Sequence, residues 1–499
     1  MSVEHDDRLD GPRSAWTLEK VLPLVQAILP AETLLHDDEE LRPFECDGFS
    51  AYKQRPMLVV LPETKEQVVE LMALCAKHGI PLVPRGAGTG LSGGALPVDG
   101  GIMVSLTRLN RVLSIDIAQQ TARVQPGVRN LAISEAVKTD GLYYAPDPSS
   151  QIACSIGGNV AENAGGVHCL KYGLTVNNVQ SLECILADGS IVELGGDCLD
   201  APGFDLLALM HGSEGMLALV TEITVKLLPT PPLAKTMLIS FDDVAKAGRA
   251  VADVIAAGII PAGLEMMDKL AIQAAEDFAH AGYPRDAEAI LLCELDGQDS
   301  DVLQSLAKLE TVFANSGALA IKVAQSETER QLFWLGRKSA FPAVGRLAPD
   351  YYCMDGTIPR KALPEVLAGI SALSEHYGLR VANVFHAGDG NLHPLILFDA
   401  NQASQMQQAE ALGGEILALC VRLGGTITGE HGVGREKINQ MCVQFSDAEL
   451  KQFHATKAAF DPQRILNPNK NIPTLARCAE FGSMHVHGGK LPFPELERF

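Results

Sequence analysis

Three glycine-rich segments in the first half of the chain restrict the fold more than any other feature. The first, PRGAGTGLSGGA at residues 84–95, places five glycines within nine positions. Glycine at this density allows a ligand to approach the backbone, and the N–H groups of such a loop suit a phosphate. The spacing of Gly86, Gly88 and Gly90, and the strand-like GIMVSL that soon follows, do not fit the strand–helix dinucleotide motif. We therefore predict a strand–loop–strand phosphate cradle and disfavour a Rossmann fold.

The other two segments extend this pattern. They are YYAPDPSSQIACSIGGNVAENAGG at residues 143–166 and GSEG at residues 212–215. One such cluster usually serves a tight turn, whereas three within one mixed α/β region favour a long cofactor that spans them. FAD offers a pyrophosphate for the first loop and a flat isoalloxazine ring for the second.

Composition excludes several classes of protein. A chain of 499 residues is too long for one core and indicates two or three domains. The formal charge of −21, without a useful Lys/Arg cluster, argues against nucleic-acid binding. The first residues lack an apolar signal region, and no apolar run approaches the length of a membrane span. We expect a cytoplasmic protein that reaches a membrane only through partners.

The eleven cysteines are scattered and none forms a C-x-x-C pair. In a cytoplasmic chain we expect reduced, mostly buried thiols. No iron–sulfur ligand pattern is present. Any electrons taken up by this protein must therefore leave to another molecule.

Changes in the pattern of expected helices and strands divide the chain into segments. Residues 1–52 form an N-terminal helical segment, and residues 53–231, rich in short strands, form the FAD-binding domain. Residues 232–430 alternate helices and strands, which predicts an α+β domain with helices on one antiparallel sheet. Residues 431–473 read as a C-terminal helical segment, which we expect to return to the flavin site. Residues 474–499 form a tail suited to partner docking or to wrapping the surface.

Two motifs in the second half carry metal-binding chemistry. NVFHAGDGNLHP places His386 and His393 on either side of a tight turn, and GGTITGEHGVG places Glu430 beside His431. Two imidazoles and one carboxylate suit a catalytic divalent ion with open positions for substrate. An isolated histidine is more often a surface or core residue. We give that interpretation to His78, His168, His211, His280, His376 and His454.

The order of PRGAGTGLSGG, PDPSS…IGGNVAENAGG and GSEG resembles the vanillyl-alcohol-oxidase/p-cresol-methylhydroxylase (PCMH) superfamily, and the second half resembles its FAD-linked 2-hydroxy-acid oxidases. The resemblance runs from about residue 10 to the tail. It implies an α+β fold with a two-part PCMH-type FAD-binding domain and a substrate (cap) domain built on an antiparallel sheet. It also implies a noncovalent FAD, because the phosphate loop carries no histidine. A divalent ion (Zn, Mn or Fe) would be held by His386, His393 and Glu430, with His431 as the base.

The same resemblance assigns the remaining site residues. Arg337 is the candidate for the substrate carboxylate, with a surface ion pair as its alternative and Lys338 as a weaker candidate. The pyrophosphate loop comprises Arg85, Gly86, Ala87, Gly88, Thr89, Gly90, Leu91 and Ser92; the flavin path comprises Asp147, Pro148, Ser149, Gly157, Gly158, Asn159, Asn163 and Gly215. Relatives with larger substrates place polar groups where Cys353 and Leu395 stand, which favours a small monoacid here. Phe341 and Trp334 are candidates to fill the vacated volume.

These assignments imply oxidation of glycolate to glyoxylate, with hydride transfer to flavin N5. A D-lactate dehydrogenase and a non-catalytic flavin-binding subunit are the alternatives. The implied partners are a flavoprotein-like E subunit and an iron–sulfur F subunit of a glycolate oxidase complex, which deliver electrons to quinone. The protein would then lie at the inner face of the membrane through these partner subunits.

Overall fold

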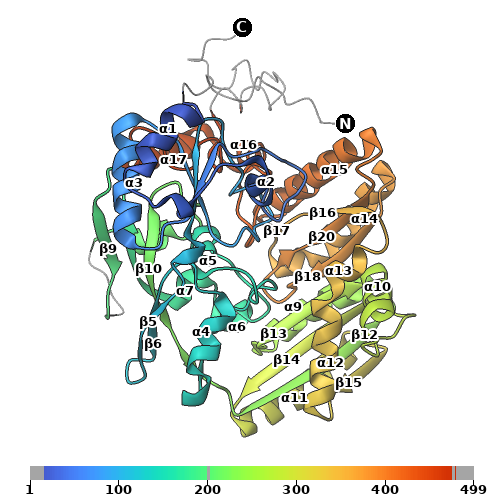
Figure 1. The fold of residues 1–499 in the computed structure, drawn as a ribbon. Helices are drawn as coiled ribbons and strands as arrows, with labels where there is room; N and C mark the ends of the chain where they lie inside the picture. Colours follow the sequence, from blue (N-terminus) through green and yellow to red (C-terminus); the bar gives the residue numbers. More distant parts are fainter. Residues whose placement is uncertain (1–15, 199–202, 475–477, 479–499) are drawn as a thin grey trace.

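The structure is a computed structural model that describes residues 16–198, 203–474 and 478. Two α+β halves lie side by side, the first running from blue to green and the second from yellow to orange (Figure 1). Among the described residues, no helix is long and apolar enough to cross a membrane.

The phosphate loop joins two strands of a four-stranded sheet, in the order β1-β2-β4-β3. The strands are β1 (Leu34–Leu35), β2 (Leu58–Val60), β3 (Leu82–Arg85) and β4 (Ile102–Ser105). The loop runs directly from β3 to β4, which pair in parallel, so the predicted strand–loop–strand arrangement is confirmed. The associated helices are α1 (Leu18–Gln26), α2 (Asp38–Leu41) and α3 (Lys65–His78), with 3₁₀ turns η1 (Ala31–Thr33), η2 (Arg42–Phe44) and η3 (Leu106–Arg108). A capping box between Thr64 and Gln67 starts α3.

The second sheet of this half is antiparallel, in the order β5-β6-β10-β8-β9. Its strands are β5 (Val112–Asp116), β6 (Thr121–Val124), β8 (Val179–Ile185), β9 (Ile191–Gly195) and β10 (Leu219–Lys226). Asp188-Gly189 stands between two apolar runs, a sequence that predicts a hairpin turn. The pair joins β8 to β9 as a hairpin, with Gly189 at φ 87°. Around this sheet lie α4 (Asn130–Val137), η4 (Lys138–Asp140), α5 (Ile156–Glu162), α6 (Cys169–Tyr172), α7 (Thr175–Asn178) and α8 (Leu206–Met210); β7 (Leu142–Tyr143) pairs with β11 (Leu228–Pro229).

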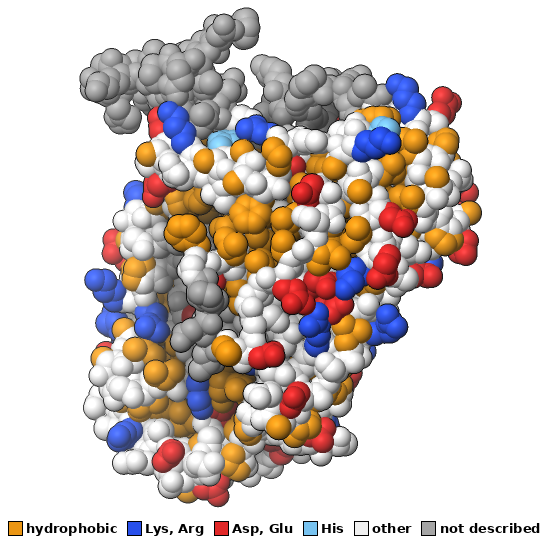
Figure 2. Space-filling model, turned by 90° about the vertical axis from the view of Figure 1, so that its left-hand side faces the viewer, with side chains coloured by type: hydrophobic (Ala, Val, Ile, Leu, Met, Phe, Trp, Pro, Cys, Tyr) orange, Lys and Arg blue, Asp and Glu red, His pale blue; other side chains and the backbone are white. Residues whose placement is uncertain are grey.

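Hydrophobic side chains gather on the face that Figure 2 shows, which is the left-hand side of Figure 1. The two edge strands of the five-stranded sheet lie on this side in Figure 1. Strand β5 carries Ile115 at 38% and Ile117 follows it at 46% exposure, while Ile191 of β9 is 48% exposed. Apolar surface that gathers on one face is typical of protein–protein contact.

The second half is built on a seven-stranded antiparallel sheet, as predicted, in the order β15-β12-β14-β13-β18-β20-β16. Its strands are β12 (Leu233–Phe241), β13 (Gly263–Asp268), β14 (Ala289–Gly297), β15 (Ala320–Val323), β16 (Asp350–Cys353), β18 (Val381–Phe385) and β20 (Pro394–Phe398); β17 (Gly356–Thr357) pairs with β19 (Asn391–Leu392). Its helices are α9 (Val244–Ala256), α10 (Lys269–Ala279), α11 (Asp299–Asn315), α12 (Glu327–Lys338), α13 (Ala340–Val344), η5 (Arg360–Ala362), α14 (Leu363–Tyr377) and α15 (Ala403–Arg422).

The C-terminal segment returns to the first half after α16 (Met441–Gln444) and α17 (Asp447–Phe460). Leu82 of β3 donates its N–H to Ile465 and accepts from the N–H of Asn467, both at 2.7 Å. Ile465 and Leu466 are buried in the same core as α1 and α3, and Figure 1 shows α17 in red beside these blue helices. This return places the residues after α15 next to the phosphate loop.

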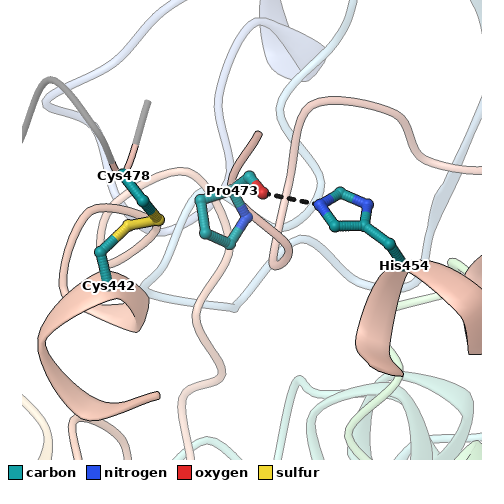
Figure 3. The surroundings of a disulfide bond; sticks show 4 residues. All are labelled: Cys442, His454, Pro473 and Cys478. Carbon is teal, nitrogen blue, oxygen red and sulfur yellow. Dashed lines mark hydrogen bonds between the residues drawn. A yellow bond between two sulfur atoms is a disulfide. The ribbon is translucent and has the colours of Figure 1, made fainter. Parts of the chain in front are cut away.

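One expectation about the cysteines is corrected. Cys442 of α16 and Cys478 form a disulfide across a Cα–Cα distance of 5.3 Å (Figure 3). The return of the chain brings these two residues together across 36 positions without a sequence motif. The other nine cysteines are free thiols, mostly buried, as predicted. Apart from Thr474 and Cys478, the predicted docking tail at residues 474–499 lies outside the described residues.

Candidate active site

A cavity of about 450 Å³ connects the three glycine-rich segments with the second half of the molecule. Residues 85–91, Pro148, Ser149, Gly157, Gly158, Asn159 and Gly215 line it on one side. Lys338, Phe341, His393, Glu430 and His431 line it on the other. The predicted cofactor loops and the predicted chemical groups therefore face one shared space.

Three of the predicted cofactor-binding residues lie behind the cavity wall. Ser92 is 1% exposed, and its carbonyl accepts the N–H groups of Arg435 and Glu436. The Asp147 carboxylate turns away to His168, and the Asn163 side chain accepts the N–H of Val176 at 3.0 Å. These residues shape the cavity from outside instead of lining it.

Arg85 lines the cavity, but its guanidinium is occupied by the protein. It donates to the carbonyl of Cys46 at 2.8 Å and lies over the ring of Phe44 at 5.5 Å. The side chain therefore holds the segment before the first domain against the loop, and the loop backbone remains as the candidate phosphate contact.

At two positions of the cavity wall, glycine is sterically required. A Cβ on Gly86 would lie 2.3 Å from the Ser155 hydroxyl, and one on Gly215 would lie 2.3 Å from Cγ of Pro84. Gly215 also adopts φ +67°, which side chains disfavour. This close packing leaves a cavity bounded by backbone, which fits a cofactor held through main-chain N–H groups.

The predicted metal ligands converge. Nε2 of His393 lies 3.0 Å and Nε2 of His386 lies 3.4 Å from Oε1 of Glu430. His386 directly follows β18 and His393 directly precedes β20, so the predicted turn between strands brings both imidazoles together. Burial raises the pKa of Glu430, but the hydrogen bonds from the two imidazoles lower it by a larger amount. The net pKa therefore lies well below its ordinary value. Within the described part of the chain, the second oxygen, Oε2, is buried without a hydrogen-bond partner. These features fit a divalent cation.

A carboxylate behind the trio was not predicted. Both oxygens of Glu265, on β13, lie 2.8 Å from Nδ1 of His386, which orients Nε2 toward Glu430. Arg337, the predicted partner of the substrate carboxylate, places Nη2 2.7 Å from Glu265 and is only 2% exposed. It is therefore in a buried ion pair and is not among the cavity-lining residues. The available signal was a glutamate within the apolar strand GLEMM, where burial demands a partner.

Asp355 was also missed, and it holds the loop that carries Glu430 and His431. Its buried carboxylate accepts the N–H groups of Gly429 at 3.0 Å, Glu430 at 3.1 Å and His431 at 2.9 Å. Nζ of Lys437 lies 3.1 Å from the same carboxylate, and both side chains are fully buried. The loop is thus fixed by a charged acceptor from the link between β16 and β17.

Glu214 fixes the same loop from the first half of the molecule. Its two carboxylate oxygens accept the N–H groups of Val433 at 2.7 Å and Gly434 at 2.8 Å. Asn471 donates to the same side chain at 2.7 Å. Glu214 adopts φ 51°, a strained conformation for a residue other than glycine. The GSEG segment therefore contacts the cavity and the histidine loop together.

His431 stands at the edge of the trio, with Nε2 4.0 Å from Oε1 of Glu430. Burial lowers the pKa of His431 to about 4, although the Asp355 carboxylate acts in the opposite direction. Its imidazole is therefore neutral near pH 7 and able to accept a proton.

The residues predicted to set the size of the substrate pocket do not all lie at the cavity. Phe341 lines the cavity with its ring centroid 6.2 Å from that of His393. Trp334 instead donates Nε1–H to Glu294 at 2.6 Å. Cys353 and Leu395 are buried strand partners that do not line the cavity.

Comparison with known proteins agrees with this arrangement. The protein family described as "FAD binding domain" matches residues 56–195, and the family described as "FAD linked oxidases, C-terminal domain" matches residues 230–471. The glycolate oxidase subunit GlcD of Escherichia coli (strain K12) is 64% identical over 499 residues, which is 100% of both chains. A D-lactate dehydrogenase of Anaerostipes hadrus is 31% identical over 92% of this chain and 99% of its own length.

The fold has solved counterparts. The structure of p-cresol methylhydroxylase with bound substrate superposes with a TM-score of 0.78 at 18% sequence identity, covering 93% of this chain and 98% of the other. This likeness confirms the predicted α+β architecture with a PCMH-type FAD-binding domain. The chain therefore belongs to the FAD-linked oxidases of the vanillyl-alcohol-oxidase/PCMH superfamily.

Proposed function

We propose that this protein oxidises glycolate to glyoxylate with noncovalent FAD, as the catalytic subunit of a larger complex. The observation that carries the proposal is one cavity lined by the glycine-rich loops on one side and by His393, Glu430 and His431 on the other. The likeness to a glycolate oxidase subunit over the full chain supports the choice of substrate. Residues 84–95 contain no histidine for a covalent flavin link.

His386, His393 and Glu430 are the proposed ligands of a divalent ion. Two imidazole nitrogens lie within 3.4 Å of one carboxylate oxygen, and Glu265 holds His386 in the required orientation. When bound, the ion would supply Lewis acidity toward the 2-hydroxyl and FAD would supply the hydride acceptor.

His431 is the proposed base. The neutral imidazole accepts the hydroxyl proton at Nε2, the atom that faces Glu430. The hydrogen bonds that Asp355 and Glu214 accept from residues 429–434 keep this nitrogen at its place beside the metal ligands.

Two cations are candidates for the substrate carboxylate. Lys338 lines the cavity and is an exposed residue, whereas Arg337 is buried and paired with Glu265. We propose that Lys338 contacts the carboxylate and that Arg337 acts through Glu265 and His386. Lys338→Met should then raise KM with little change in metal content, and Arg337→Met should reduce metal retention. Phe341 limits the cavity beside His393, which favours a small 2-substituent.

Oxidation of D-lactate to pyruvate is the second candidate, supported by the D-lactate dehydrogenase relative. The substrates differ by one methyl group, which a pocket discriminates by only about 1–3 kcal/mol. A non-catalytic flavin subunit is less well supported, because the ligand trio and His431 are all present and convergent.

The reduced flavin must pass its electrons onward. We propose an iron–sulfur F subunit and a flavoprotein-like E subunit as partners, with transfer to quinone at the inner face of the membrane. The relative named as a subunit and the exposed apolar side chains on the two edge strands β5 and β9 support assembly with other chains.

Anaerobic mixing tests the function directly. Purified protein is mixed with glycolate, D-lactate or D-2-hydroxyglutarate while flavin bleaching is followed. We expect bleaching by glycolate, loss of bleaching after chelation, and loss in His431→Ala with FAD still bound. Undiminished bleaching in His431→Ala would remove this residue from the mechanism.

A further inference from the structure

A second group of metal-ligating side chains lies beside the first. Cys353, His393 and His431 each offer one ligand atom, and these atoms lie within 4.8 Å of one another. Cys353 is a buried free thiol at the end of β16, paired with Leu395, two residues after His393. The proposed oxidation gives this thiol no role.

The orientation of the two imidazoles creates the group. Nε2 of His393 and Nε2 of His431 both face Oε1 of Glu430, at 3.0 and 4.0 Å. The rings stack with centroids 4.9 Å apart and planes inclined by 20°. Both Nδ1 atoms therefore point away from Glu430, and both are buried without a hydrogen-bond partner in the described part of the chain. His393 is only 2% exposed, and a buried nitrogen in this state calls for an explanation.

We propose that Cys353 and the Nδ1 atoms of His393 and His431 form a second, thiophilic metal site that takes Zn²⁺ or Cd²⁺ and inhibits the enzyme. One sulfur and two imidazole nitrogens are ligands that zinc prefers, at about 2.3 and 2.0–2.1 Å. The carboxylate-containing trio is harder, so the two sites differ in their preference for soft ions. Binding at the second site releases the thiol proton.

The shared imidazole sets the order of occupation. An ion on each nitrogen of His393 requires that ring to give up its remaining proton. The second site is therefore the weaker one and fills only when metal is in excess.

An ion at the second site prevents His431 from acting as the base, because it fixes the tautomer of the imidazole. A neutral imidazole has one protonated nitrogen, so an ion on Nδ1 of His431 leaves the proton on Nε2. Nε2 is the atom proposed to accept the substrate proton, and in this tautomer it can only donate. The inhibition rests on the proposed function, whereas the binding does not.

The experiment titrates Cd²⁺ into protein that carries FAD and a filled first site. Cys198, the exposed thiol, is replaced by serine in every protein used. We expect one equivalent of Cd²⁺ to produce a thiolate-to-cadmium absorption band and a sulfur-shifted ¹¹³Cd resonance. Cys353→Ser should lose both signals. Cys184→Ser, which removes another buried thiol, from β8, should keep them.

Activity is measured separately. In the parent protein, saturating Cd²⁺ should slow flavin reduction by glycolate at least tenfold, and in Cys353→Ser it should not. Thiolate-bound Cd²⁺ that persists in Cys353→Ser, or none in the parent, would overturn the site. If glycolate does not reduce the flavin even without Cd²⁺, the proposed function fails while the spectra still test the site. If Cys353→Ser does not fold, protection of Cys353 from alkylation by Cd²⁺, mapped by mass spectrometry in the parent, replaces it; an unprotected Cys353 would refute the proposal.

Discussion

Replacing Asp355 by asparagine removes the charge that holds the histidine loop. The carboxylate accepts three consecutive backbone N–H groups and faces the Lys437 ammonium at 3.1 Å, with both side chains fully buried. Removing one partner of a buried pair costs about 3–5 kcal/mol, because the other charge stays uncompensated. For a domain of this size each kcal/mol lowers Tm by about 2–4 °C, so the apparent Tm should fall by roughly 10 °C.

A variant that changes both residues of the pair distinguishes the effect of an unpaired buried charge from the effect of altered side-chain shape. Lys437→Met alone should destabilise by a similar amount, whereas Asp355→Asn combined with Lys437→Met should recover part of the loss, since both charges of this pair are then removed together. The recovery is incomplete because buried Glu436, 3.8 Å from Nζ of Lys437, still loses its cation. The assay is thermal unfolding of the FAD-loaded protein, with bound metal measured in parallel. An apparent Tm of Asp355→Asn within about 1 °C of the parent, or a double variant less stable than both single ones, would refute this account.

Three further changes test other contacts. Glu265→Gln should weaken metal binding by about 10–100-fold, because His386 loses the carboxylate that orients it; equilibrium dialysis measures this, and unchanged affinity would contradict it. Gly215→Ala should weaken FAD binding by roughly tenfold, since its Cβ meets Pro84 and its φ is +67°. Gly196→Ala, with open space around it, is the control. Flavin fluorescence titration measures the FAD affinity of both variants, and an equal loss of affinity in the two would count against this reasoning. Burial lowers the pKa of His168, but Asp147 and Glu294 raise it well above the ordinary value; this stabilisation is full below about pH 6.5 and is lost as pH rises through the raised pKa. The Tm gap between the parent and His168→Gln should therefore narrow with increasing pH, and a gap that widens would exclude this ion pair as its source.

Local sequence chemistry predicted much of the fold. The glycine spacing of residues 84–95 predicted a strand–loop–strand cradle, and Asp188-Gly189 predicted the hairpin between β8 and β9. His386 and His393 were predicted to converge because a tight turn separates them by only seven positions. In each case the residues that determine the local structure are close together in the sequence.

Contacts between distant segments were decided by the tertiary structure alone. His386 and Glu265 are 121 residues apart, His431 and Asp355 are 76 apart, and Gly434 and Glu214 are 220 apart. The pairing of Arg337 with Glu265, of His168 with Asp147 and Glu294, and of Cys442 with Cys478 has the same origin. Periodicity and turn chemistry describe how each segment folds, but they do not encode which segments meet. The sequence thus determined the glycine-rich loops and the proposed metal ligands, and the packing of the two halves determined which buried charges hold them in place.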